Sequence, residues 1–141
     1  MAGLCEPALM SQENVSVVRM IYEAFARGDR AGMFRHADPE IRCYDRPIRP
    51  DASVYEGHDG WAKFMETDLE AFENVGYEPL RFIDAGPYVV VPIRQTGRGK
   101  RSALDVEESI VNVWKLRAGR CIEMRVYSTM AEALEAVGMG E

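Results

Sequence analysis

The sequence predicts an α+β fold, with a mostly antiparallel sheet covered on one side by helices. Apolar residues recur at helical spacing through most of the first half of the chain, whereas the second half changes to strand-like alternation broken by short turns. Short turns join antiparallel neighbours, and helices gathered ahead of strands are typical of α+β domains. A length of 141 residues fits one such domain.

The first helix is expected to begin at Ser11, a favourable N-cap residue, and to end at Gly28. Residues 1–10 are apolar but have neither a positively charged start nor a long apolar run, so they predict a loose tail rather than a signal peptide. Residues 11–138 form the single predicted domain. Its first apolar stripe consists of Val15, Val18, Tyr22 and Phe25.

A short second helix is expected over residues 30–36, capped by Asp29. The period then changes to two, which places Ile41, Cys43 and Asp45 on one face of a strand. Prolines interrupt this pattern directly afterwards. An irregular loop is therefore expected between this strand and the third helix.

The third helix is expected over residues 57–74, where helical spacing returns. Most of the remaining chain is predicted to be strand, followed by a helix over residues 130–137 that Thr129 caps. The four later strands are expected at about residues 77–84, 88–96, 105–116 and 121–127.

The charge balance argues against two classes of partner. The chain carries 17 Lys and Arg against 23 Asp and Glu, a net charge of −6, and has no basic cluster. Nucleic acid and anionic membrane surfaces require concentrated positive charge, so neither is expected as a partner. The 3 cysteines have no Cys-x-x-Cys spacing, and their odd number fits a reducing cytoplasm.

Asp45 is the first candidate for a catalytic general base. If Ile41 and Cys43 face inward, the pleat of the strand directs Asp45 inward as well. An acid held among apolar groups has a raised pKa, which suits proton transfer near neutral pH. The alternative is a surface aspartate that caps the following loop or pairs with Arg42 or Arg46. Beside this carboxylate, Cys43 is expected to be a small packing residue rather than a nucleophile.

Arg94 and His58 are the other catalytic candidates. Arg94 shares its alternation with Val90 and Pro92, and it can pair with Asp45, clamp a ligand oxygen, or reach solvent from a strand end. His58 stands near the start of the third helix, where it acts in acid–base chemistry or serves as a loop or capping residue. No set of metal ligands has a usable spacing, so neither a metal nor another cofactor is expected.

Several short strings carry a resemblance to a known family. They read YEAFARGD at residues 22–29, HADPEIRCYD at 36–45, YEGHDGW at 55–61, VWKLRAGR at 113–120 and RVY at 125–127. In these strings and in its order of elements, the chain resembles the nuclear transport factor 2-like superfamily and, within it, the SnoaL-like branch. The resemblance implies a cone-shaped α+β barrel, commonly a homodimer, with a pocket between the helices and the concave face of the sheet.

The resemblance also bears on individual positions. In the ketosteroid isomerases of this superfamily, the general base is an aspartate at the end of the first strand, where this chain has Asp45. The tyrosine and the acid that bind the oxyanion in those enzymes correspond to Ile21 and Val111, which implies that this oxyanion site is absent. The catalytic Arg, Asp and Asp of limonene-type epoxide hydrolases are replaced by Pro92, Arg94 and Val126.

The sequence therefore predicts an apolar pocket for a small molecule with a carbonyl group. The expected activity is that of a cofactor-free isomerase, cyclase, hydrolase or lyase that uses Asp45, with Arg94 or a water holding the developing oxygen charge. The alternative is a non-catalytic ligand-binding or dimerising accessory domain. The residues expected to contact the ligand are Ile21, Tyr22, Phe25, Cys43, Trp61, Phe64, Met65, Val111, Val113, Met124 and Val126.

The outer face of the sheet is the expected dimer contact. On the last two strands, Asn112, Trp114, Arg125 and Tyr127 alternate with the residues expected to face inward. Exposed Trp and Tyr on an outer sheet face are typical of subunit interfaces. Glu107 shares the inward parity, either as a second pocket acid or as a solvated residue near a strand end.

Overall fold

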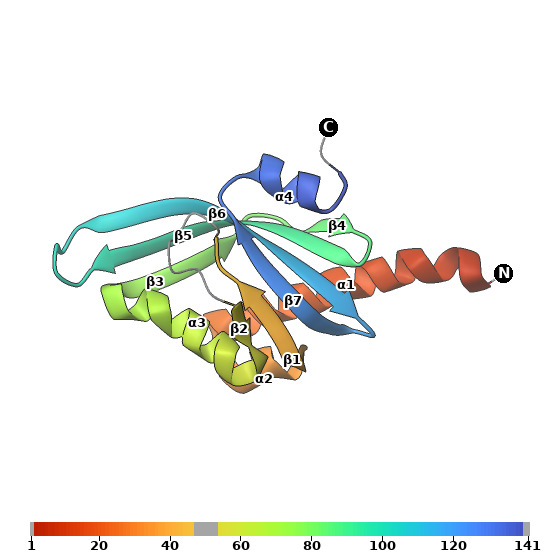
Figure 1. Ribbon diagram of the computed structural model, residues 1–141, viewed down its shortest axis with the longest axis horizontal. Coiled ribbons are helices and arrows are strands. Elements are labelled where there is room, and N and C mark those ends of the chain that lie inside the picture. The colour runs from red at the N-terminus through yellow and green to blue at the C-terminus, as the bar shows by residue number, and fades with distance from the viewer. Residues whose placement is uncertain (1, 47–53, 140–141) are drawn as a thin grey trace.

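The computed structural model describes residues 2–46 and 54–139. Over these residues the predicted α+β fold is confirmed, because helices come first and a curved, unclosed, mostly antiparallel sheet follows (Figure 1). The elements, in chain order, are α1 (Ala2–Ala26), α2 (Arg30–Arg35), β1 (Ala37–Tyr44), β2 (Val54–Glu56), α3 (Gly57–Ala71), β3 (Phe72–Pro79), β4 (Ile83–Ala85), β5 (Tyr88–Gly99), β6 (Asp105–Arg117), β7 (Arg120–Tyr127) and α4 (Met130–Ala136).

The strands of the described residues form one sheet. They lie in the order β2-β1-β7-β6-β5-β3, and β4 also pairs with β5. Each pair is antiparallel except β1 and β7, which run parallel with Tyr44 beside Arg125. Parallel neighbours need a long connection, and here the whole chain from β2 to β6 provides it. The parallel pair brings the end of β1 beside the last strand.

The sheet has a concave face covered by three helices and an outer face covered by one. On β5, Val89, Val91 and Ile93 belong to the main core with α1, whereas Val90 belongs to a second cluster with Ala133 of α4. This alternation is that of a strand buried on both faces. In Figure 1, α1, α2 and α3 lie on one side of the sheet and α4 lies on the other.

The alternation on β6 is the reverse of the prediction. Ile110 and Trp114 belong to the main core, whereas Val111 and Val113 lie in the outer cluster with α4. The physical reason is that α4 covers the outer face here, so residues 110–114 are all buried and apolar character no longer distinguishes the two faces. The prediction that Trp114 is an exposed contact on the outer face is therefore wrong.

The predicted helix caps are present, but α1 starts earlier than predicted. Asp29 caps α2 by accepting a hydrogen bond from the Gly32 N–H at 2.9 Å, and Thr129 caps α4. α1 already includes residues 2–10, so it begins ahead of the predicted start at Ser11. The division into a tail and a domain at this position stays a prediction. No described helix is both long enough and apolar enough to cross a membrane.

The strands around α3 also differ from the prediction. β2 lies at the end of the predicted irregular loop, most of which falls outside the described residues. β3 begins at Phe72, inside the predicted third helix, because Phe72 pairs with Gly99 of β5 and packs over Gly97. An apolar residue at this position fits both the helical and the strand spacing of apolar residues, and only the pairing with β5 decides for the strand. The strand predicted over residues 77–84 is divided between β3 and β4.

Candidate functional site

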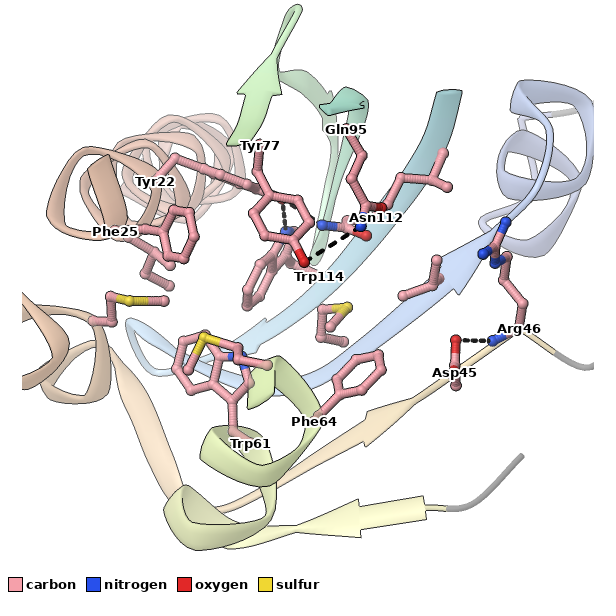
Figure 2. A pocket seen from close by; sticks show the side chains of 16 residues that line it. Tyr22, Phe25, Asp45, Arg46, Trp61, Phe64, Tyr77, Gln95, Asn112 and Trp114 are labelled. Atoms are coloured by element: carbon pink, nitrogen blue, oxygen red, sulfur yellow. Dashed lines mark hydrogen bonds between the residues drawn. The ribbon is translucent and has the colours of Figure 1, made fainter. Parts of the chain in front are cut away.

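A cavity of about 100 Å³ lies between the helices and the concave face of the sheet (Figure 2). Its walls come from α1, α2 and α3, from strands β3, β5, β6 and β7, and from the residues that follow β1. Most of the lining side chains are aromatic or aliphatic. Polar groups enter the lining at three places, beside Tyr22, beside Tyr77 and at Asp45.

Many of the residues predicted to contact a ligand lie in this wall. Residues three and four positions apart share one face of a helix, so α1 and α3 each present a stripe of side chains to the sheet. β7 contributes from its inward face, as its alternation predicts. The predicted contact residues in the wall are Ile21, Tyr22, Phe25, Trp61, Phe64, Met65, Met124 and Val126.

Three predicted contact residues lie outside the lining. Val111 and Val113 pack under α4 on the other face of the sheet. Cys43 is fully buried in the core without reaching the cavity, and burial raises the pKa of its thiol to about 12. A thiol with so high a pKa is a packing group and not a nucleophile at neutral pH.

The structure does not bring Arg94 or His58 to the cavity. Arg94 lies on the outer face and forms ion pairs with Glu78 at 2.9 Å and with Glu107 at 3.7 Å. His58 stacks on Phe34 with 5.1 Å between the ring centroids, and its Nε2 is 3.1 Å from the Ala37 carbonyl oxygen. His58 therefore joins the start of α3 to β1, and Glu107 is a solvated residue rather than a pocket acid.

A buried polar cluster joins α1 to β6 inside the cavity. The Tyr22 hydroxyl accepts hydrogen bonds from Asn112 Nδ2 at 2.8 Å and from Trp114 Nε1 at 3.0 Å. Burial raises the pKa of Tyr22 well above its ordinary value, so the phenol stays protonated. Because the oxygen accepts two bonds, its own hydrogen is left to donate to a third group.

Asn112 is the buried polar residue of this cluster that the sequence analysis placed on the wrong face. The residue is 9% exposed, and its Oδ1 has no hydrogen-bond partner within the described part of the chain. A buried polar atom without a partner costs about 1–3 kcal/mol. The resemblance pointed to Ile21 and Val111 as the oxyanion positions; the structure instead brings together Tyr22 and Asn112, each one residue further along. An asparagine in the middle of an otherwise apolar strand is the signal that was available for finding it.

Tyr77 and Gln95 form a second polar group in the cavity wall. Gln95 Nε2 donates to the Tyr77 hydroxyl at 3.5 Å, and the Tyr77 ring packs edge-on against Phe25 with 5.1 Å between centroids. On another wall, Trp61 and Trp114 pack edge-on with 5.8 Å between their ring centroids. Such flat aromatic walls suit a planar ligand.

The charged end of the cavity consists of Asp45 and Arg46, which follow β1. Asp45 Oδ1 accepts a hydrogen bond from the Arg46 backbone N–H at 2.7 Å. Because β1 ends at Tyr44, the alternation of the strand no longer separates these two residues, and both side chains line the cavity. The sequence predicted Asp45 as the candidate base and Arg46 only as a surface partner of Asp45 in the alternative interpretation.

Arg46 is held by one carboxylate, and its Nε has no partner among the described residues. Its side chain is 16% exposed, and its two terminal nitrogens donate to the Glu108 carboxylate at 3.0 and 3.1 Å. Arg46 Nε is buried and has no hydrogen-bond partner among residues 2–46 and 54–139. A guanidinium group has five N–H donors in a rigid fork, and Glu108 uses one edge of that fork.

Proton transfer is the chemistry that the cavity residues offer most directly. A carboxylate at the charged end can take or give a proton, and the hydroxyl, amide and guanidinium groups can orient or stabilise ligand oxygens. Within the described residues, no group of three or more His, Cys, Asp or Glu side chains is placed to hold a metal ion. The absence of a cofactor stays a prediction.

Sequence and structure comparisons place these features in a family. Residues 18–124 match the model of the SnoaL-like domain family. No curated protein matches the chain. An NTF2-like protein from Burkholderia xenovorans LB400 is 29% identical and has a TM-score of 0.69, over 82% of this chain and 88% of that one.

Two further solved structures are similar in fold. A proposed SnoaL-like polyketide cyclase from Jannaschia sp. CCS1 is 21% identical, with a TM-score of 0.72 over 92% of this chain and 94% of that one. TerC, crystallised with polyporic acid, is 18% identical, with a TM-score of 0.72 over 89% of this chain and 98% of that one. At these identities the likeness shows the fold alone.

Proposed function

Because the chain belongs to the SnoaL-like domain family, we propose that it binds an apolar, carbonyl-containing small molecule in the cavity and that Asp45 moves a proton on that molecule. The reaction class is that of a cofactor-free isomerase, cyclase, hydrolase or lyase. The observation that carries the proposal is a carboxylate in the wall of a mainly apolar cavity that also holds a few fixed polar groups. Pockets of this composition are typical of small-molecule sites.

The dimensions of the cavity favour a ligand with a single ring in its enclosed part. A dry cavity of about 150 Å³ holds benzene, so this cavity of about 100 Å³ has to widen by side-chain movement to enclose one ring and has no room for two. A larger ligand extends beyond the enclosed part. TerC, which shares the fold, was crystallised with polyporic acid, and this supports an organic small molecule as the ligand.

The sheet register supports simultaneous contact with Asp45 and Asn112. Val126 of β7 pairs with Asn112 of β6, and Tyr44 of β1 pairs with Arg125 of β7. Asp45 therefore follows β1 at the level of Val126. Neighbouring strands lie about 4.8 Å apart, which places the backbones of Asp45 and Asn112 roughly 10 Å apart. A substituted ring spans such a distance between the two side chains.

The proposed step is proton abstraction from a carbon next to a carbonyl group. Asp45 accepts the proton, and the electrons of the C–H bond form a carbon–carbon double bond while the carbonyl oxygen becomes an enolate. Return of the proton, at the same or another carbon, completes an isomerisation or prepares a ring closure. The step uses no oxidant, reductant or cofactor.

Acetophenone in deuterated buffer tests this proposal. Binding is followed by NMR through the side-chain signals of Trp61 and Trp114, and proton abstraction is followed by the entry of deuterium into the methyl group of acetophenone. We expect the wild type to bind and to accelerate the exchange. Asp45→Asn should still bind but lose the acceleration by about 100-fold or more. Asp105→Asn, which alters a carboxylate whose side chain is 87% exposed, should exchange like the wild type.

The alternative function is ligand binding without chemistry. It is favoured by one observation: of the three predicted catalytic residues, Arg94 and His58 lie outside the cavity. The same NMR experiment separates the two functions. Binding of acetophenone without accelerated exchange in the wild type would support the alternative, and equal exchange by the wild type and Asp45→Asn would reject the role of Asp45.

Dimerisation through the outer face and a cytoplasmic location also remain proposals. Tyr127 is only partly buried at the edge of the outer cluster that α4 covers, and a partly exposed tyrosine on this face supports a subunit contact there. Analytical ultracentrifugation of the wild type against Tyr127→Glu tests the contact, because a new charge at a buried interface should dissociate a dimer. The free, buried thiols of Cys43 and Cys121 support a reducing compartment.

A further inference from the structure

Arg46 is more deeply buried than Arg94, Arg98 and Arg125, which also form ion pairs in the described part of the chain. Its side chain is 16% exposed, whereas the side chains of Arg94 and Arg98 are 50% and 46% exposed. Arg46 also lines the cavity, next to the carboxylate that we propose as the base. Its Nε–H is buried without an acceptor in the described residues. A desolvated donor without a partner at a binding site points to an acceptor on the ligand.

Glu108 fixes the direction of this donor. Its two oxygens receive the two terminal nitrogens of Arg46 in a bidentate pair, which restricts rotation of the guanidinium plane. The Nε edge of the fork is then held in place before any ligand arrives. Such preorganised donors stabilise a charge that develops during a reaction, because they need little reorganisation when the charge forms.

The charges around Arg46 favour a transient oxyanion over a permanent anion. Asp45, Arg46 and Glu108 together carry a net charge of −1 when all three are ionised. A ligand carboxylate would make the net charge of the group −2, and the carboxylates of Asp45 and Glu108 would repel it. Abstraction of a proton by Asp45 neutralises that residue as the enolate forms, so the net charge of the group stays at −1. The site therefore suits an oxygen that becomes negative only as Asp45 is protonated.

We infer that Arg46 is a second catalytic residue, whose Nε–H donates a hydrogen bond to the carbonyl oxygen that becomes the enolate while Asp45 takes the proton. The inference rests on the proposed function and assigns to Arg46 the role that the sequence analysis gave to Arg94. The proton passes from the substrate carbon to an Asp45 oxygen, the C–H electron pair forms the carbon–carbon double bond, and the carbonyl π pair moves to the oxygen. Glu108 is a positioning residue for Arg46.

A phenol that ionises near neutral pH tests this inference without a known substrate. The 4-nitrophenolate oxygen mimics the enolate, and the phenol and phenolate differ in colour. Asp45→Asn serves as the background, because its neutral amide stands in for the protonated acid. In Asp45→Asn, we expect the pKa of bound 4-nitrophenol to lie at least about one unit below that of the free probe. In Asp45→Asn/Arg46→Gln, we expect the pKa of bound 4-nitrophenol to return to that of the free probe.

Matched controls isolate the contribution of Arg46. Asp45→Asn/Arg94→Gln removes the same charge from the outer face and should leave the pKa of the bound probe as in Asp45→Asn. Asp45→Asn/Arg46→Lys keeps a positive charge without the fork, and we expect it to keep only part of the lowering. 4-Nitroanisole, which cannot ionise, should bind all variants within about twofold. Circular dichroism verifies folding, and if Arg46→Gln does not fold, the Lys variant decides the question.

The outcomes separate this inference from the proposed function. If the probes bind and the pKa of bound 4-nitrophenol is the same with and without Arg46, the role of Arg46 is wrong while the proposed ligand site stands. If neither 4-nitrophenol nor 4-nitroanisole shifts the NMR signals of Trp61 or Trp114, the cavity is not a site for such molecules and both proposals are wrong.

Discussion

Asn112 donates a hydrogen bond to the Tyr22 hydroxyl at 2.8 Å and so joins the concave face of the sheet to α1. Trp114 donates to the same oxygen at 3.0 Å. The three side chains are buried together, so each hydrogen bond replaces a contact with water that folding removed. This cluster sets the distance between the helix and the sheet at the point where the cavity lies, and it presents the remaining hydroxyl hydrogen for donation.

Tyr22→Phe should destabilise the fold by more than the loss of one hydrogen bond. The change removes the hydroxyl oxygen that accepts hydrogen bonds from both Asn112 Nδ2 and Trp114 Nε1. Each orphaned donor costs about 1–3 kcal/mol, so we expect a loss of about 3 kcal/mol in the free energy of unfolding. Urea denaturation followed by circular dichroism measures this loss.

The double variant Tyr22→Phe/Asn112→Leu provides the control. Leucine removes one orphaned donor together with the unpartnered Oδ1 of Asn112. We expect the double variant to be about 1 kcal/mol more stable than Tyr22→Phe alone. A double variant that loses the sum of the two single changes would contradict the proposed origin of the cost.

The stability of the protein should fall at alkaline pH through the buried thiols. Burial raises the pKa of the Cys43 thiol from its ordinary value of about 9 to about 12, so the folded state keeps this thiol protonated at pH values where the unfolded chain ionises. The associated stability is fully present below about pH 9 and is lost progressively as the pH rises from about 9 to 12.

Cys43→Ala isolates the contribution of that thiol. Between pH 9 and 10, the free energy of unfolding of the wild type should fall by about 1 kcal/mol more than that of Cys43→Ala. Urea denaturation at both pH values measures the difference. Equal losses in the two proteins would show that Cys43 ionises as readily in the folded state as in the unfolded chain.

A pair of substitutions on β6 should separate stability from ligand binding. Val113 is buried under α4, and Ile110 is buried on the face that lines the cavity. We expect Val113→Ala and Ile110→Ala each to lower the free energy of unfolding by about 2 kcal/mol, since both truncate the core. Only Ile110→Ala should change the affinity for acetophenone beyond about twofold, as measured by NMR titration. An equal effect of Val113→Ala on affinity would contradict the orientation of β6.

The parts of the fold that depend on local chemistry were predictable from the sequence. Asp29 and Thr129 cap their helices as predicted, because capping requires only a side-chain oxygen near the first free N–H groups. The order of the elements followed from the change of hydrophobic period. Asp45 lines the cavity, as expected from the inward parity of Ile41 and Cys43, although β1 itself ends one residue earlier, at Tyr44.

Features that depend on contacts between distant segments were not predictable in this way. Phe72 is apolar in a helix or in a strand, and its pairing with Gly99 makes it part of a strand. Arg46 reaches the cavity only because β1 ends before it and Glu108, 62 residues further along, receives its guanidinium group.

The sequence by itself determined the fold class, the helix caps and a carboxylate at the end of the first strand, because these depend on composition, period and near neighbours. Tertiary structure alone decided which face of β6 meets the cavity. Where α4 covers β6, apolar residues lie on both faces of the strand, so hydrophobicity no longer reveals the inward face. The contacts of Asn112 and Trp114 with Tyr22 show that these two residues face inward.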